Sequence, residues 1–342
     1  MDVATIEDFL ALRTSFPVLD TRSPGEFDSG HMANAINVPL FDNEERARVG
    51  TAYKKQSKQE AIKLGLEIVG PKMVGFIEIA EKLDSKHLLI HCWRGGMRSK
   101  SVAWLMETYG LQVTTLAGGY KAYRTAVLDY FNQPLSLLVL TGATGSRKTA
   151  VLHALREMGE QVIDLEGLAN HNGSSFGNQL STGQPTTEQF QNDLFESFRI
   201  LDPTKRIWIE DESFTIGRVK LIEQLYWQKQ QAPHVLIHLP MEARVKALVE
   251  DYGKIPLEKL VIATNQIAER LGKNKALEAI ELIKTGNLPE AVHIILQYYD
   301  KTYAKGIRKK SPLIQHEMAF DTSDPYEMVS QLIQIVNPAN NI

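Results

Sequence analysis

The chain of 342 residues has room for about two domains of ordinary size. Apolar residues make up 43% and charged residues 23%, which excludes wholesale disorder, and a net charge of -3 gives no overall basic field for nucleic acid. No apolar run approaches the roughly 18 residues of a membrane helix, and no basic segment precedes an apolar stretch at the start. We therefore expect no membrane association and a cytoplasmic location.

The first third of the chain alternates short apolar runs with segments of helical spacing. Strands are expected at 16–19, 35–38, 87–91 and 112–115, and helices at 6–13, 71–83, 98–109 and 120–130. Strands that alternate with helices favour a mainly parallel sheet covered on both faces. A junction at 131–136 contains Asn and Pro, so we divide the chain into domains at 1–132 and 133–342.

The second part of the chain begins with another alternating unit. Its expected strands are 137–140, 161–163, 206–209 and 235–239, and from about Met241 the pattern is helical to near the end. The predicted fold class is α/β throughout, with a second domain that carries a helical C-terminal extension.

Cys92 is the single cysteine, so any thiol chemistry within the chain depends on it alone. It follows a predicted strand and precedes a predicted helix, where loop amides and a helix N-terminus favour the thiolate. Gly95 and Gly96 allow successive amides to face inward as an anion cradle, and Arg98 adds donors for an oxyanion. The alternative is a buried structural cysteine. The predicted anion loop contains Trp93, Arg94, Gly95, Gly96 and Met97 between Cys92 and Arg98.

Two segments beside this loop resemble the rhodanese family. The residues that carry the resemblance are Asp20, Arg22, Glu26, Phe27, Gly30, His31, Ala35, Asn37 and Pro39, followed by Gly118, Gly119 and Tyr120. His31 is a candidate base, but in rhodaneses this segment is mostly scaffold. Five residues separate Cys92 from Arg98, as in the C-x5-R loop of phosphatases, whereas common sulfurtransferases have C-x-x-G-x-R. Chalcogen transfer and phosphate-ester hydrolysis therefore remain competing interpretations.

A second loop nearly fits the pattern G-x-x-x-x-G-K-[ST] of a phosphate-binding P-loop. Its residues are Gly142, Gly145, Ser146, Arg147, Lys148 and Thr149, with Arg147 in place of glycine. Backbone amides at a helix N-terminus would wrap a phosphate, and Thr149 is able to hold a metal. A degenerate, structural loop is the alternative. Glu210, Asp211 and Glu212 follow a predicted strand, as either a metal-binding acidic site or a solvated acidic loop.

The ordered set of motifs resembles the bacterial tRNA 2-selenouridine synthases over nearly the whole chain. It comprises 92–99, 142–149, 165–177, 184–190 and 209–213; Asn172 stands where that family usually has a basic residue after His171. The resemblance implies that sulfur of wobble 2-thiouridine in tRNA is replaced by selenium from selenophosphate, after geranylation with geranyl diphosphate. Cys92 would serve the selenium step, and the P-loop would hold a diphosphate. No tightly bound cofactor is expected besides Mg²⁺ as an option, and a selenophosphate-supplying enzyme is an implied partner.

A basic segment late in the chain is the expected contact for tRNA. It contains Lys301, Lys305, Arg308, Lys309 and Lys310, with tyrosines close by, and Lys54, Lys55 and Lys58 form a second basic group. A solvated helix face is the alternative. Two rival functions remain open: a C-x5-R phosphatase fused to a nucleotide-binding module, and a non-catalytic RNA- or nucleotide-binding protein.

Overall fold

The structure is a computed structural model that describes residues 1–171 and 183–336. The chain divides into two compact units, Met1–Tyr130 with Gln191–Glu196, and Phe131–Phe190 with Ser197–Ile342. The N-terminal segment of the first unit ends at Tyr130, and the junction predicted from the sequence spans 131–136. Gln191–Glu196, which the prediction includes in the second domain, groups with the first unit. Within the described residues, no helix is long and apolar enough to cross a bilayer.

The first unit is built on a parallel sheet with the strand order β1-β5-β4-β2-β3. The strands are β1 (Asp2–Ala4), β2 (Val18–Asp20), β3 (Ile36–Asn37), β4 (His87–His91) and β5 (Gln112–Leu116). Leu88, Leu89 and Ile90 of β4 are fully buried, as expected for a strand covered on both faces. The helices are α1 (Ile6–Leu12), α2 (Pro24–Ser29), α3 (Asn43–Lys55), α4 (Lys58–Val69), α5 (Met73–Lys82), α6 (Met97–Thr108) and α7 (Gly119–Asp129).

The four strands and four helices expected in this unit are present with small shifts of their ends. The edge strand β1 and the helices α2, α3 and α4 are not among the predicted elements. Their signals were local: Ser23 and Asp42 each form a capping box with a glutamate three residues later, which marks the first turn of α2 and α3. A search for apolar periodicity overlooks such polar helix starts.

The second unit contains a parallel sheet with the strand order β12-β11-β6-β8-β7. Its strands are β6 (Leu137–Gly142), β7 (Gln161–Ile163), β8 (Ile207–Glu210), β11 (His234–His238) and β12 (Ile314–Ala319), and β9 (Thr215–Ile216) and β10 (Val219–Lys220) form a separate antiparallel pair. Helices beside this sheet are α8 (Lys148–Glu157), α9 (Leu165–Leu168), α11 (Glu223–Gln231) and α17 (Pro325–Val336), and α10 (Thr187–Arg199) contributes residues to both units. The central place of β6 puts the loop after it at the carboxyl edge of the sheet, where such folds bind ligands.

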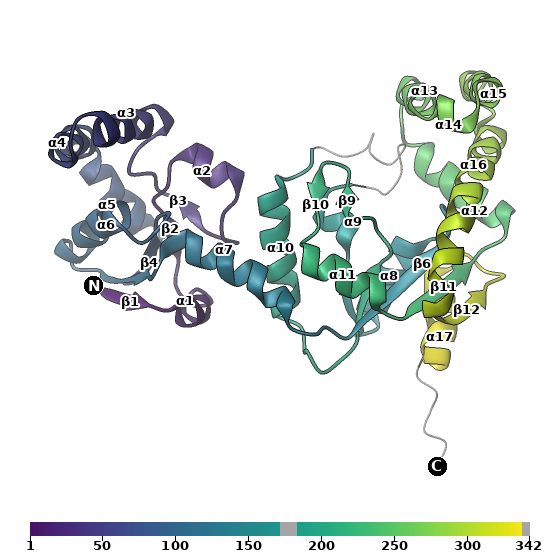
Figure 1. The fold of residues 1–342 in the computed structure, drawn as a ribbon, viewed down its shortest axis with the longest axis horizontal. Coiled ribbons are helices and arrows are strands. Elements are labelled where there is room, and N and C mark those ends of the chain that lie inside the picture. The colour runs from purple at the N-terminus through teal and green to yellow at the C-terminus, as the bar shows by residue number, and fades with distance from the viewer. Residues whose placement is uncertain (172–182, 337–342) are drawn as a thin grey trace, which may run out of the picture. The chain divides into compact units, whose positions relative to one another are not determined.

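The helical extension follows β11 (Figure 1). It has a hydrophobic core of its own. It consists of α12 (Met241–Tyr252), α13 (Leu257–Gln266), α14 (Ala268–Leu271), α15 (Lys273–Lys284) and α16 (Leu288–Lys310). The prediction of helix from Met241 to near the end is wrong at β12, which returns to the sheet beside β11. β12 is an edge strand in which only Met318 is buried. Its polar His316 and Glu317 interrupt the apolar run that would have predicted a strand.

Candidate active site

The cysteine loop (residues 92–98) connects the end of β4 to the first turn of α6. Three backbone amides, those of Arg94, Gly96 and Ser99, point at the Cys92 sulfur, and the Gly96 amide lies 3.3 Å from Sγ. The Ser99 hydroxyl donates to the same sulfur at 3.2 Å. Cys92 is only 3% exposed, so this sulfur lies at the bottom of a closed ring of donors.

This ring of donors changes the acidity of the thiol. Burial raises the pKa of Cys92. The hydrogen bonds from the Ser99 hydroxyl and from the amides of Ser99, Arg94 and Gly96 lower it by more than burial raises it, so the net pKa lies below the ordinary value. A lowered pKa gives more thiolate at neutral pH, and the thiolate is the nucleophilic form. The loop therefore presents an activated sulfur.

Glycine is required where the cysteine loop meets α7. Gly119 has a φ of 62°, and a Cβ there would collide with Cys92 O and with the amides of Arg94 and Gly95. Gly95 has a φ of 63°, and a Cβ there would lie 2.8 Å from Leu116 O. The first turn of α7 also fixes the loop, because the Tyr120 amide donates to Cys92 O at 2.8 Å. The closing glycines of the rhodanese signature thus hold the shape of the cysteine loop.

Arg98 forms an ion pair that the sequence did not predict. Its Nη1 donates to Glu26 Oε2 at 2.6 Å, and Arg46 Nε lies 3.0 Å from the same oxygen. Burial raises the pKa of Glu26, but the bonds to Arg98, the Ser23 amide and the charge of Arg46 dominate and lower it to about 2. Glu26 therefore stays ionised and fixes Arg98, whose remaining N–H groups are left for an anion.

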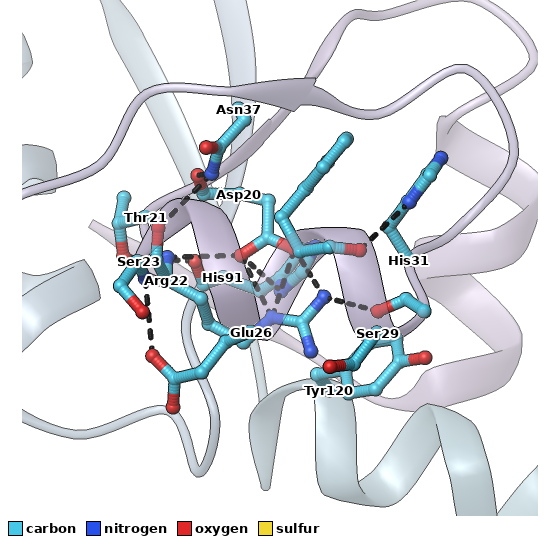
Figure 2. A network of polar contacts seen from close by, with 12 residues as sticks. Asp20, Thr21, Arg22, Ser23, Glu26, Ser29, His31, Asn37, His91 and Tyr120 are labelled. Atoms are coloured by element: carbon cyan, nitrogen blue, oxygen red, sulfur yellow. Dashed lines mark hydrogen bonds and ion pairs between the residues drawn. The ribbon is translucent and has the colours of Figure 1, made fainter. Parts of the chain in front are cut away.

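A buried ion pair lies between the end of β2 and the start of α2 (Figure 2). Arg22 Nη2 donates to Asp20 Oδ2 at 2.6 Å and to Gly30 O at 2.7 Å, and its guanidinium stacks 3.6 Å from the centre of the Tyr120 ring. Both members of the pair are fully buried. His31 lies at the end of α2, where its ring stacks on Phe27 and Nδ1 is 3.0 Å from Phe27 O (Figure 2). These contacts fit a scaffold role for this segment.

The phosphate loop (residues 142–149) connects β6 to α8. Gly142 and Gly145 are both closely packed: a Cβ on Gly142 would lie 2.8 Å from Ile237 Cγ1, and one on Gly145 would lie 3.1 Å from Leu248. Lys148 Nζ donates to Gly142 O at 2.6 Å and so curls over the loop. The Ser146 hydroxyl is buried with no hydrogen-bond partner in the described part of the chain. An unpartnered donor in this cradle fits a bound phosphate oxygen.

Arg147 takes up the conformation that the P-loop pattern reserves for glycine. Its φ is 63°, in the left-handed region, and its Nη2 donates to Glu250 Oε2 of α12 at 2.7 Å. Arg244 of the same helix donates to Thr144 O at 3.2 Å and pairs with Asp300 at 2.6 Å. The loop therefore keeps a glycine-like backbone despite the substitution, and α12 supports it.

Carboxylates gather beside Thr149 at the end of β8. The Thr149 hydroxyl lies 3.5 Å from both Glu166 Oε2 and Glu210 Oε1, and the Glu166 amide donates to Glu210 Oε2 at 2.9 Å. Burial, together with the charge of Glu212, raises the pKa of Glu166 to about 8, and burial with the charge of Glu166 raises that of Glu210. Both carboxyls therefore favour their protonated forms in this structure.

The side chains of Asp211 and Glu212 have different neighbours. Asp211 pairs with Lys310 and lies 3.8 Å from the buried Lys229, whose Nζ also donates to Glu212 O. Burial raises the pKa of Asp211, but the two lysines dominate and keep it below the ordinary value. Glu212 interacts with Glu166 and with His171, and burial lowers the pKa of His171. Of the three predicted acids, Glu210 lies 3.5 Å from the Thr149 hydroxyl, and Glu212 joins the same cluster through its hydrogen bond with Glu166.

The structure offers a partial fit to Mg²⁺. The described residues contain no group of three or more His, Cys, Asp or Glu side chains that could hold a metal. Mg²⁺ is, however, usually held by one or two protein oxygens plus substrate phosphates. Thr149 and Glu210 fit that arrangement, so a metal here would bind together with a phosphate ligand.

The predicted tRNA-binding residues lie in the last turns of α16. Lys301, Arg308 and Lys309 are exposed, while Lys310 is half-buried and paired with Asp211. The side chain of Lys305 and residue Asn172 lie outside what the structure describes. Ser99, Arg46 and Glu166 were absent from the predicted site residues. Only Glu166 had a local signal, as an acid shortly after β7.

The fold and the two loops define a class of protein, a rhodanese-like domain joined to a P-loop domain. Residues 5–126 match the Rhodanese-like domain family, and residues 135–285 match the family described as the tRNA 2-selenouridine synthase AAA domain. The chain belongs to the tRNA 2-selenouridine synthase family, as comparison with whole relatives shows.

Three relatives illustrate the similarity, each named tRNA 2-selenouridine synthase. The protein of Shewanella frigidimarina is 37% identical over 268 residues, which cover 75% of this chain and 70% of that protein. The protein of Pseudomonas syringae pv. syringae is 37% identical, with 87% of this chain and 90% of that protein covered. The protein of Proteus mirabilis is 32% identical, with 91% and 94% covered.

Proposed function

We propose that this chain is a transferase that converts 2-thiouridine at the wobble position of tRNA into 2-selenouridine, in two steps. In the first, the nucleobase sulfur attacks C1 of geranyl diphosphate; the S–C bond forms, the C–O bond breaks and diphosphate leaves. In the second, selenium from selenophosphate replaces the geranylated sulfur. Family membership supports the overall conversion.

The phosphate loop is suited to the first step. The amides at the start of α8, the Ser146 hydroxyl and Lys148 would bind the diphosphate, and their positive field stabilises the charge that develops on the leaving group. Thr149 and Glu210 would hold Mg²⁺, which supplies further neutralisation of the diphosphate when bound. The supporting observation is the unpartnered Ser146 hydroxyl inside the loop.

The cysteine loop is suited to the second step. The Cys92 thiolate attacks the phosphorus of selenophosphate, the S–P bond forms, the P–Se bond breaks and hydrogen selenide is released beside the substrate. Selenide then attacks C2 of the geranylated base; the C2–S bond breaks, and geranyl thiolate leaves and takes a proton. Water cleaves the S–P bond and releases phosphate. No oxidant or reductant is needed, and Arg98, held by Glu26, binds the phosphoryl oxygens.

The observation that carries this proposal is the lowered pKa of the single cysteine in a ring of donors, on a chain that also holds a P-loop. The test uses an anticodon stem-loop RNA containing 2-thiouridine, with nucleosides analysed by mass. Geranyl diphosphate alone should yield S-geranyl-2-thiouridine, and added selenophosphate should yield 2-selenouridine. Unchanged 2-thiouridine under both conditions would contradict the proposal.

A phosphatase is the second candidate function, because Cys92 and Arg98 have C-x5-R spacing and the thiol pKa is lowered. The two functions differ in the fate of a simple aryl phosphate. A phosphatase hydrolyses it with turnover, whereas a loop specialised for selenophosphate should release little phosphate from it. The remaining candidate, a non-catalytic RNA- or nucleotide-binding protein, requires that binding function survive in the Cys92→Ala variant.

A further inference from the structure

A large cavity lies in the first unit beside the cysteine loop. It has a volume of about 780 Å³ and lies among α3, α4 and the first turns of α6. This volume is in the range of small-molecule sites. The lining includes Phe41, Gly50, Tyr53, Leu66, Met97 and Arg98.

The lining of this cavity combines apolar side chains with charges of a single sign. Most lining residues are apolar, and three of them, Tyr53, Leu66 and Met97, are large side chains that stay more than half exposed. Exposed apolar groups gathered around a hollow mark a binding site. Four basic residues and no acidic residue belong to the same lining: Arg46, Lys54, Lys58 and Arg98. A hydrocarbon chain carried by a polyanion satisfies both features.

The cavity shares lining residues with the end of the cysteine loop, where the selenium step is proposed to occur. Met97, Arg98 and Ser101 belong to the first turns of α6, and Arg98 closes the cysteine loop. The Glu26 carboxylate joins Arg98 to Arg46, so these two cations of the lining are fixed together. A ligand in the cavity can therefore place an anionic group beside Arg46 and Arg98.

We propose that this cavity receives the geranyl chain of the S-geranylated tRNA intermediate while selenium replaces the sulfur. This inference rests on the proposed function. Lys54 and Lys58 contact the RNA phosphates around the modified nucleotide, and the apolar lining holds the chain. The buried chain positions C2 of the base for selenide, and the geranyl thiol formed in the step remains in the cavity until release.

The test compares two stem-loop RNAs, one with S-geranyl- and one with S-methyl-2-thiouridine, for binding to the full chain. The wild type should bind the geranyl RNA about 50-fold more tightly, the factor given by burial of about three CH₂ groups. Gly50→Phe should reduce this preference about tenfold, because Gly50 lines the cavity and its Cβ would enter open space. Gly75→Phe on α5 is the control: it also meets open space but lies outside the lining, and should keep the preference.

A second pair of variants guards against a folding defect. Leu66→Gln should lower the geranyl preference, whereas Leu128→Gln, the same substitution at an exposed leucine of α7 outside the lining, should not. Circular dichroism verifies that each variant is folded. An unchanged preference in both Gly50→Phe and Leu66→Gln overturns the inference, even if the wild type converts the geranyl RNA to 2-selenouridine. Failure of that conversion in the wild type counts against the proposed function instead.

Two further outcomes separate other occupants. If Gly50→Phe slows geranylation with geranyl diphosphate and leaves binding of the geranyl RNA intact, the cavity holds the donor's chain and the assignment is overturned. The same holds if the wild type is a dimer in solution and Gly50→Phe makes it a monomer, because the cavity is then an interface between copies. Unimpaired geranylation together with a lost geranyl preference supports the inference.

Discussion

The cysteine loop and the phosphate loop occupy equivalent places in two different sheets. Each follows a buried parallel strand, contains a glycine with positive φ and opens a helix. In the first, the amides converge on a sulfur whose pKa is lowered; in the second, a lysine and a hydroxyl line the loop, and the neighbouring carboxyls have raised pKa values. The same backbone arrangement therefore surrounds a thiol in one unit and, in our proposal, a diphosphate in the other, according to the side chains placed on it.

The strongest way to break this comparison is to remove the sulfur. Cys92→Ala should reduce selenium insertion by at least about 1,000-fold, because no second thiol exists and nucleophile removal has effects of this size. Geranylation should continue at the wild-type rate. Mass analysis of nucleosides measures both, and added hydrogen selenide should restore selenation. Selenation by the alanine variant at the wild-type rate would rule out the thiolate mechanism.

Removal of the loop cation in the second unit is the reciprocal change. Lys148→Ala should lower geranylation about 100-fold, since one charge-assisted contact to the leaving diphosphate is lost, and leave tRNA binding unchanged. Steady-state geranylation and a tRNA titration test this. The opposite pattern, in which Cys92→Ala loses geranylation and Lys148→Ala retains it, would reverse the assignment of loops to steps.

We expect neither loop to contribute most of the tRNA affinity, and the salt dependence of that affinity tests this expectation. Neutralising Lys305, Arg308 and Lys309 together should reduce the slope of log K against log salt by about two to three units, through loss of up to three phosphate contacts. Lys310 is kept because it pairs with Asp211. Neutralising the exposed Lys63, Lys82 and Lys205 is the control. An unchanged slope in the α16 variant would move the RNA surface to Lys54, Lys55 and Lys58.

The ion pair between Glu26 and Arg98 should be visible in the pH dependence of the free energy of unfolding. The folded pKa of Glu26, about 2, lies below its ordinary value of 4.5, so its stabilisation is complete above pH 4.5 and is lost as the pH falls towards 2. Glu26→Gln should cost on the order of 2 kcal/mol at pH 7, after allowance for partial exposure. Urea unfolding at several pH values checks this. A difference between variant and wild type that persists at pH 2 would contradict the linkage.

The smallest expected effect concerns the substituted position of the phosphate loop. Because Arg147 has a left-handed backbone, Arg147→Gly should be about 1 kcal/mol more stable than Arg147→Ala, which keeps the unfavourable φ. Both variants lose the contact with Glu250 equally, so the difference isolates the backbone. Thermal unfolding of the pair measures it. Equal stability of the two variants would show that the loop relaxes to another conformation.

The parts of the site predicted from sequence are those defined by neighbours along the chain. The predicted bounds of β4 match both of its ends, because five consecutive residues carry the pattern of a buried strand. The two loops are predictable because each combines a strand, glycines and a helix start. Glu26 and Arg98 are 72 residues apart, and Glu166 and Glu210 are 44 apart, so their contacts depend on tertiary packing that no local pattern encodes. The edge strands β1 and β12 were missed for a related reason, since partial exposure removes the apolar run.

The place of β12 in the second sheet bears on how the chain is made. β12 pairs with β11, yet 75 or more residues of helix and loop separate the end of β11 from its start. At about 5–20 residues per second, a ribosome would therefore expose the hydrophobic edge of β11 for several seconds before its partner emerges. A shortened protein that ends at residue 285, the limit of the matched family domain, would keep that edge open permanently. Such a fragment should aggregate, and its nascent form should be a client for chaperones that shield strand edges.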